Sequence, residues 1–250
     1  MIGRTGAGKS SLANLLADQN LFKTGTGSIS ITKDYQSELF NNEETGITYR
    51  IIDTIGLGDT TLSQEEVLNK LLKVTERLEN GLHQVLFVVS GRFTKEEVAV
   101  FEALRALFGE EVVNYCTIVR NRFPEFRNPI RSEQDFENLV DEEGKIREVL
   151  EKIRGEIIYL DNPPLVGSVN RKEAAKKIQQ ASREKLLNHL TTKRLPYQVN
   201  LDQAELNQRI QAHLDPLEKQ VQETQKELTQ KQEQLNQSRP TNQKITDWNR

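Results

Sequence analysis

The chain has 250 residues, with 36% hydrophobic and 28% charged residues and a formal net charge of −3. This length accommodates one sizeable domain with an appendage, and the low hydrophobic fraction predicts a compact part joined to a solvated helical part. The net charge disfavours nucleic-acid binding as the main function, and no apolar stretch is long enough to span a bilayer. The single cysteine, Cys116, lies in an apolar run, which predicts a buried strand residue in a reducing, cytoplasmic compartment without evident membrane association.

The first feature along the chain is a glycine-rich segment that fits the phosphate-binding pattern G-x-x-x-x-G-K-[ST]. In this pattern the backbone N–H groups surround a polyphosphate, the lysine reaches its β- and γ-phosphates, and the serine hydroxyl binds Mg²⁺. A buried strand normally precedes such a loop. Here only Met1 and Ile2 do, so we expect either a chain that starts late, with its first strand truncated, or a complete chain whose central strand is a stub. The predicted phosphate-binding residues are Gly3, Arg4, Thr5, Gly6, Ala7, Gly8, Lys9, Ser10 and Ser11.

The segments that follow predict an α/β domain. Ser63 with Glu66, and Thr94 with Glu97, have the spacing of capping boxes and predict the starts of two helices. Because strands alternate with helices, we expect the fold of a phosphate-loop NTPase, with a mostly parallel sheet and helices on both faces. Strands are predicted at 35–40, 47–53, 84–90, 113–120 and 157–160, and helices at 9–17, 63–80, 94–108 and 132–154, the last broken near Gly144.

After Arg171 the chain changes to charged, amphipathic segments, which predict helices over 172–195 and 201–214. The sequence Asp-Pro-Leu-Glu at 215–218 predicts the start of another helix. Apolar residues then recur at heptad spacing, and they indicate either a weak coiled-coil seam or a helix that folds back on the domain. We therefore expect a nucleotide-binding domain over 1–170, a helical extension over 171–237 and a disordered tail over 238–250. The heptad residues are Leu214, Val221, Leu228 and Leu235.

A second motif, Asp53-Thr54-Ile55-Gly56, follows the strand predicted at 47–53. In phosphate-loop enzymes an Asp at this place holds Mg²⁺ through water. The N–H group of Gly56, three residues later, is expected to meet the γ-phosphate. Thr32 lies in the Gly-, Ser- and Thr-rich loop between the motifs, where it is expected to bind Mg²⁺ only when a γ-phosphate is present. Ser10, Thr32 and Asp53 are therefore the predicted metal ligands.

Three segments resemble the AIG/GIMAP (IAN) family of immunity-associated GTPases, in the septin-like branch. They are the phosphate loop at 3–11, SITK at 30–33, and VVSGRFTKEE at 88–97, the last resembling the G-R-F-T-x-E-E box of the family. The resemblance covers residues 1–162, with a helical extension typical of the family. It implies a G domain that uses GTP, GDP and Mg²⁺, forms a nucleotide-dependent homodimer or oligomer through its nucleotide face, and hydrolyses GTP slowly unless paired.

The guanine-reading motif departs from the family pattern. Asn121 and Arg122 stand where GTPases have Asn and Lys, but Pro124 stands where the base-binding Asp is expected. Asn162 matches the Asn that lines the base pocket after the last strand. The resemblance thus assigns Asn121, Arg122 and Asn162 to the base, and leaves open a nucleotide-promiscuous NTPase. Asp161 is another carboxylate that would be placed to bind a base.

Catalysis is the other open question. Small GTPases place Gln after the Gly of the second motif to orient the attacking water, whereas this chain has Leu57. Arg92 follows the strand predicted at 84–90 and is expected on the nucleotide face. In a face-to-face pair it would act in trans as an arginine finger, or else serve as a structural or dimer-contact residue. A slow GTPase and a binding-only scaffold both remain compatible with the sequence.

Overall fold

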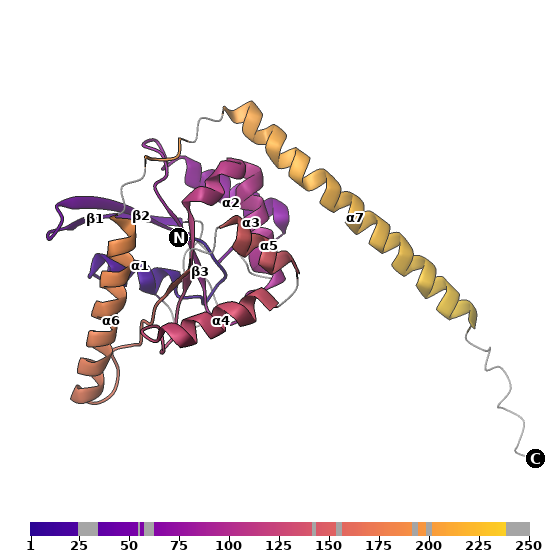
Figure 1. The fold of residues 1–250 in the computed structure, drawn as a ribbon. Coiled ribbons are helices and arrows are strands. Elements are labelled where there is room, and N and C mark those ends of the chain that lie inside the picture. The colour runs from indigo at the N-terminus through magenta and orange to yellow at the C-terminus, as the bar shows by residue number, and fades with distance from the viewer. Residues whose placement is uncertain are drawn as a thin grey trace, which may run out of the picture.

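The computed structural model describes residues 1–24, 35–54, 56–57, 63–141, 144–153, 157–191, 195–198 and 202–238 (Figure 1). A central β-sheet carries helices on both sides, and a long C-terminal helix leaves the body of the molecule. The strands are β1 (Tyr35–Asn42), β2 (Ile47–Thr54), β3 (Val85–Val89), β4 (Cys116–Arg120) and β5 (Ile157–Tyr159). The helices are α1 (Lys9–Ala17), α2 (Gln64–Thr75), α3 (Lys95–Phe108), the 3₁₀ helix η1 (Glu110–Tyr115), α4 (Pro129–Asp141), α5 (Gly144–Lys152), α6 (Val169–Leu190) and α7 (Gln203–Ser238).

The strands form two pieces of sheet that the first residues of the chain connect. β1 and β2 form an antiparallel hairpin, and β3, β4 and β5 are parallel. Ile2 donates to the carbonyl of Leu86 at 2.9 Å and accepts from the N–H of Val88 at 2.8 Å, while Met1 accepts from the N–H of Thr54 at 3.2 Å. Met1 and Ile2 therefore occupy the position of a central strand between β2 and β3.

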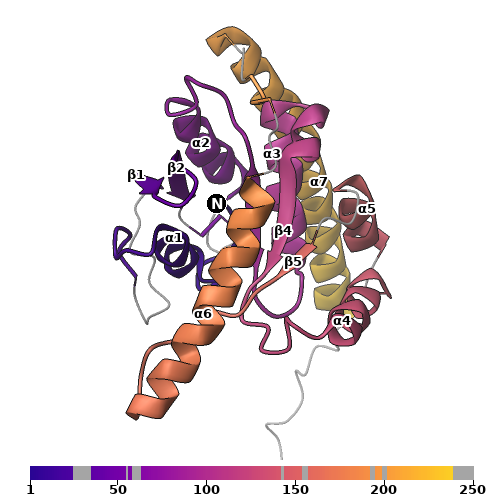
Figure 2. The same ribbon diagram turned by 60° about the vertical axis from the view of Figure 1, so that its left-hand side comes forward.

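Alternating residues of β3 face two hydrophobic clusters, as expected for a strand buried on both faces. Phe87 packs with apolar residues of α2, α3 and α5, whereas Leu86 and Val88 pack with α1 and α6. Figure 2 shows this arrangement, with α1 and α6 on one side of the sheet and α3, α5 and α7 on the other. The two layers fix the carboxyl ends of β3, β4 and β5 at one edge, beside the loop that precedes α1.

Both predicted capping boxes are present. The Ser63 hydroxyl accepts from the N–H of Glu66, and the Ser63 N–H donates to the Glu66 carboxylate. Thr94 and Glu97 make the same two hydrogen bonds. α4 ends at Asp141 and α5 begins at Gly144, and residues 142–143, where the break near Gly144 is predicted, lie outside the described residues. Each capping box depends on hydrogen bonds between residues three positions apart, so the sequence was sufficient to predict both.

Several predicted boundaries differ from those in the structure: for example, the helix predicted over 63–80 ends at Thr75. The strand expected from residue 113 begins at Cys116, because η1 takes up the residues before it. No new helix begins at Asp215, because α7 runs unbroken through Pro216. Pro216 has no N–H to donate to the carbonyl of Ala212. Because Ala212 is exposed, water can bind this carbonyl instead, which lowers the free-energy cost of a proline inside the helix.

The long helix α7 has two environments. Its first turns pack on α2 and α3, where Leu206 is 5% exposed and Ile210 and Leu214 contact the core. Beyond this contact the helix extends away from the domain, as Figure 1 shows. The heptad residues on this part are about 60% exposed: Val221 62%, Leu228 60% and Leu235 61%.

Candidate nucleotide site

The phosphate loop closes onto the carboxyl end of β4. Gly8, the residue before α1, has φ 92° and ψ 23°, and a Cβ there would lie 2.5 Å from Nδ2 of Asn121. Glycine is required at this position because other residues rarely adopt the conformation and would meet Asn121. The Asn121 amide donates to the carbonyl of Ala7 at 2.9 Å. The predicted base residue Asn121 therefore also holds the loop in shape.

Lys9 is a buried cation at the start of α1. Its side chain is bent over the loop, and Nζ donates to the carbonyl oxygens of Gly3 and Arg4 at 3.0 Å each. Burial lowers the pKa of Lys9 to about 8, although the carboxylates of Asp53 and Glu97 oppose this shift. A buried ammonium in this position gains from an anion in the loop, as the motif predicts.

Ser10 and Asp53 meet across the site. The Ser10 hydroxyl donates to Oδ2 of Asp53, which is 0% exposed at the end of β2. Oδ1 of Asp53 is buried and has no hydrogen-bond partner among the residues that the structure describes. Burial raises the pKa of Asp53, and the Ser10 hydrogen bond and the Lys9 ammonium oppose the increase.

This donor set fits Mg²⁺. A magnesium ion in a nucleotide site needs only one or two protein oxygens, because phosphates and water complete its shell. Ser10 supplies a hydroxyl, and Asp53 supplies a carboxylate with one oxygen left unsatisfied. Thr32, the third predicted metal ligand, lies outside the described residues.

Gly56 lies against the phosphate loop, as the second motif predicts. A Cβ on Gly56 would lie 1.8 Å from Oγ1 of Thr5 and 2.2 Å from its backbone nitrogen. The next residue, Leu57, donates its N–H to the carbonyl of Gly3 at 3.1 Å and buries its side chain. Gly56 therefore has no room for a side chain, and its backbone lies directly against the loop.

The predicted base residues converge on the segment 7–11. Asn162 donates to the carbonyl of Ser11 at 3.1 Å and accepts from Gln179 of α6 at 3.0 Å. Arg122 has φ 59°, and its Nη2 lies 4.0 Å from where a Cβ on Gly8 would be. Asn121, Arg122 and Asn162 are thus brought together beside α1, although none of them replaces the carboxylate missing at Pro124.

The segment 88–97, which carries the resemblance, contacts the phosphate loop through charged side chains whose contacts the motif analysis did not predict. Arg4 donates to the carbonyl of Ser90 at 2.8 Å and lies 3.9 Å from Glu97, which is fully buried. Arg120, 7% exposed, donates to the carbonyl of Gly91 and makes two bonds to Asp135 of α4, at 2.9 and 2.7 Å. Arg120 is a charged residue at the end of the apolar strand β4, and this position was the sequence feature that could have indicated its role.

Arg92 lies in the same segment and is exposed, between β3 and α3. Its neighbour Phe93 is buried and stacks on Phe87 at 5.9 Å between ring centroids. The turn is therefore anchored in the core on one side of Arg92 and to the phosphate loop, through Ser90, on the other.

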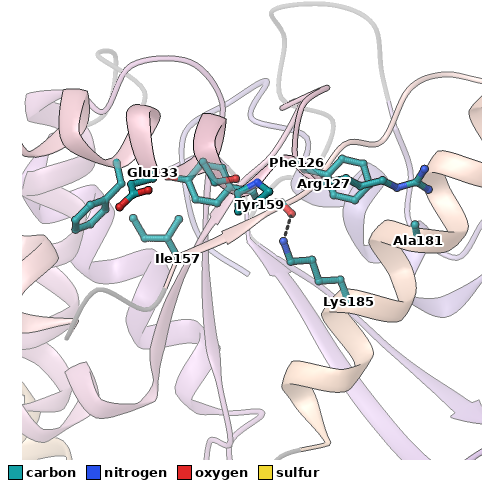
Figure 3. Close-up of a pocket in the computed structure, with 10 residues that line it drawn as sticks. Phe126, Arg127, Glu133, Ile157, Tyr159, Ala181 and Lys185 are labelled. Atoms are coloured by element: carbon teal, nitrogen blue, oxygen red, sulfur yellow. Dashed lines mark hydrogen bonds between the residues drawn. The ribbon is translucent and has the colours of Figure 1, made fainter.

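A separate surface pocket of about 770 Å³ lies between α4, β5 and α6 (Figure 3). Its lining includes Phe126, Tyr159 and Lys185, and Nζ of Lys185 donates to the carbonyl of Tyr159 at 3.2 Å. It contains none of the phosphate-loop residues. No sequence pattern predicted this pocket.

Comparison with protein families identifies the chain. A model of the AIG1 family matches residues 1–233. The chain belongs to the AIG1 family. This confirms the resemblance to the immunity-associated GTPases and makes the chain a member of a nucleotide-binding, GTP-binding G-domain family.

Several AIG1 relatives come from Arabidopsis thaliana. Immune-associated nucleotide-binding protein 8 is 35% identical over 121 residues, which are 48% of this chain and 34% of that protein. Immune-associated nucleotide-binding protein 7 is 30% identical over 169 residues, 65% of this chain and 52% of that protein. The matched part therefore spans about half or less of the length of these relatives.

Solved structures of Toc33 from Arabidopsis thaliana share the fold. Toc33 in complex with GDP and Mg²⁺ aligns with a TM-score of 0.57 and 18% identity, covering 80% of this chain and 86% of that one. Toc33 with Mg²⁺ and GMPPNP aligns with a TM-score of 0.53 and 18% identity, covering 78% and 84%. The predicted α/β G-domain fold is thus confirmed.

Among the described residues, no helix is long and apolar enough to cross a membrane.

Proposed function

We propose that this chain is a guanine-nucleotide switch that binds GTP or GDP with Mg²⁺ and hydrolyses GTP slowly, faster when two copies pair. One observation supports the proposal above all: Lys9, Ser10 and the buried Asp53 lie together beside the phosphate loop. Oδ1 of Asp53 has no hydrogen-bond partner among the described residues. The loop N–H groups and Lys9 would hold the phosphates, and Ser10 and Asp53 would hold the metal. When bound, Mg²⁺ would neutralise charge on the phosphate oxygens.

Slow hydrolysis follows from Leu57. Its side chain is 1% exposed and apolar, and its N–H is already bonded to Gly3. It therefore offers no group to orient an attacking water, which is the task of Gln in small GTPases. A useful rate needs a charge-stabilising group from elsewhere.

Pairing would bring that group. Arg92 is exposed on a turn that Ser90 and Arg4 connect to the phosphate loop, so a second copy facing this site would meet it. A Toc33 variant of the same fold is described as dimerization deficient, which supports pairing as a property of such G domains. An arginine supplied in trans is worth about 10³–10⁵ in rate. A paired scaffold without turnover is the competing function, and Pro124 also favours a site that accepts other bases.

Isothermal titration with GTP, GDP and ATP tests the binding part of the proposal. Turnover per molecule, measured against protein concentration, tests catalysis in the wild type, in Arg92→Ala and in the exposed control Arg171→Ala. We expect a rate that rises with concentration in the wild type and control. In Arg92→Ala it should stay low while sedimentation still shows the dimer. A flat rate in all three proteins would favour the scaffold.

A further inference from the structure

Buried polar atoms without partners gather around the phosphate loop. Of the five such side-chain atoms in the described part of the chain, three belong to Thr5, Asp53 and Glu97. An unsatisfied buried oxygen is rare and calls for an explanation, such as a ligand that completes its hydrogen bonds. Mg²⁺ would account for Asp53, and Glu97 lies near the charge of Arg4. The hydroxyl of Thr5 has no role in the site so far.

The position of this hydroxyl is well defined. Oγ1 of Thr5 abuts the Cα of Gly56, so close that a Cβ on Gly56 would lie 1.8 Å from it. Gly3, two residues earlier, accepts both the Lys9 ammonium and the N–H of Leu57. The Thr5 hydroxyl therefore lies against the segment that follows β2, two residues along the loop from the carbonyl that Lys9 and Leu57 contact. In the proposed site this is the end that holds the terminal phosphate.

We infer that the Thr5 hydroxyl donates a hydrogen bond to the terminal phosphoryl group of a bound nucleoside triphosphate, and so distinguishes triphosphate from diphosphate. The inference rests on the proposed function. A threonine has one O–H donor, and here no described protein group accepts it. Leu57 offers no side-chain donor on this side, so Thr5 supplies a polar group that the second motif lacks. A diphosphate has no group at this position and gains nothing from the hydroxyl.

The substitution Thr5→Val tests this, because it keeps the branched shape and removes only the hydroxyl. Thr5→Ser keeps the hydroxyl, and Thr191→Val removes a hydroxyl at the end of α6, which donates to the carbonyl of Asn188, as a matched control. The dissociation constants of GDP and GMPPNP, both with Mg²⁺, are measured by titration calorimetry. The shift of the unfolding temperature with each nucleotide is measured alongside.

We expect Thr5→Val to weaken GMPPNP binding about tenfold or more while GDP binding changes less than about twofold, as for a lost hydrogen bond to a charged group. Thr5→Ser and Thr191→Val should behave like the wild type. An unchanged GMPPNP-to-GDP ratio in Thr5→Val, an equal loss for both nucleotides, or a Thr5→Ser variant that behaves like Thr5→Val would each overturn the inference. If Thr5→Val does not fold, Thr5→Ala is judged by the same ratio. A wild type that binds neither nucleotide would instead refute the proposed function.

Discussion

The hydroxyl of Ser10 donates a hydrogen bond of 2.5 Å to Oδ2 of Asp53, which lies 43 positions later in the chain. This bond joins the start of α1 to the end of β2 and places the two proposed metal ligands side by side. We expect Asp53→Asn and Ser10→Ala each to weaken GTP binding in the presence of Mg²⁺ and to change it little in EDTA. Because both act on one ion, the double variant should lose much less than the sum of the two losses. Titration calorimetry with and without Mg²⁺ measures this, and additive losses that persist in EDTA would exclude a shared ion.

Lys9→Ala should reduce the affinity for GTP and for GDP tenfold or more. The reason is the loss of a charge-assisted contact worth about 1.5–3 kcal/mol. Lys172→Ala, which removes an exposed cation on α6, is the matched control and should leave the affinity unchanged. Equal affinities in the two variants would refute the assignment of the loop as the nucleotide site.

Nucleotide affinity should fall as the pH rises above about 8. Lys9 has a pKa of about 8 in the folded chain because burial disfavours its charged form, and bound phosphates would raise this pKa again. Between the two values, binding must take up a proton, so affinity is greatest below the lower value and declines above it. Calorimetry in buffers of different ionisation enthalpy would detect this uptake at about pH 9 and little of it at about pH 7. A Lys9→Met variant should show neither the uptake nor the decline.

Pro124 should weaken the preference for guanine. The turn after Arg122 is fixed by the N–H of Phe123, which donates to the carbonyl of Leu160 at 3.0 Å, but no carboxylate follows at position 124. A site that hydrogen-bonds a specific group rejects other ligands strongly, and that contrast is lost without the acceptor. We expect a small ratio of GTP to ATP affinity, and a larger one in Pro124→Asp. If the unmodified chain strongly prefers GTP and Asp161→Asn abolishes the preference, Asp161 reads the base instead.

The Arg120–Asp135 pair should be important for stability. The two side chains are 9% and 19% exposed and make two hydrogen bonds, so Asp135→Ala leaves a buried guanidinium without its carboxylate partner. We expect the free energy of unfolding to fall by about 3 kcal/mol, measured by urea denaturation. Glu148→Ala breaks the more exposed pair with Lys152 and should cost less than about 1 kcal/mol. Similar losses in the two variants would show that burial adds nothing to the first pair.

The parts of this site that the sequence predicted depend on residues close together along the chain. The phosphate loop and the two capping boxes are local patterns, and the structure places their residues as expected. The contacts of Arg4 with Ser90 and of Arg120 with Asp135 join residues 86 and 15 positions apart. Such pairs depend on how β3, β4 and α4 pack, which a single sequence does not specify. The sequence at 215–218 resembles a helix start, and we therefore did not predict that α7 continues through Pro216. Whether a helix tolerates a proline depends on the exposure of the carbonyl four residues earlier, which the local sequence does not indicate.

The central position of Met1 and Ile2 has a consequence for how the molecule loosens. In the described part of the chain, these residues connect the β1–β2 hairpin to the parallel strands, and a cavity of about 680 Å³ lies beside them between β2 and β3. The hairpin therefore has few backbone bonds to the rest of the sheet and should open more readily than β3 and β4, exchanging its amide protons first. Asp53 belongs to this hairpin, whereas Lys9 and Ser10 belong to α1. A metal and nucleotide bound by these three residues would connect the hairpin to the parallel strands. The rigidity of the hairpin would then depend on whether the nucleotide site is occupied.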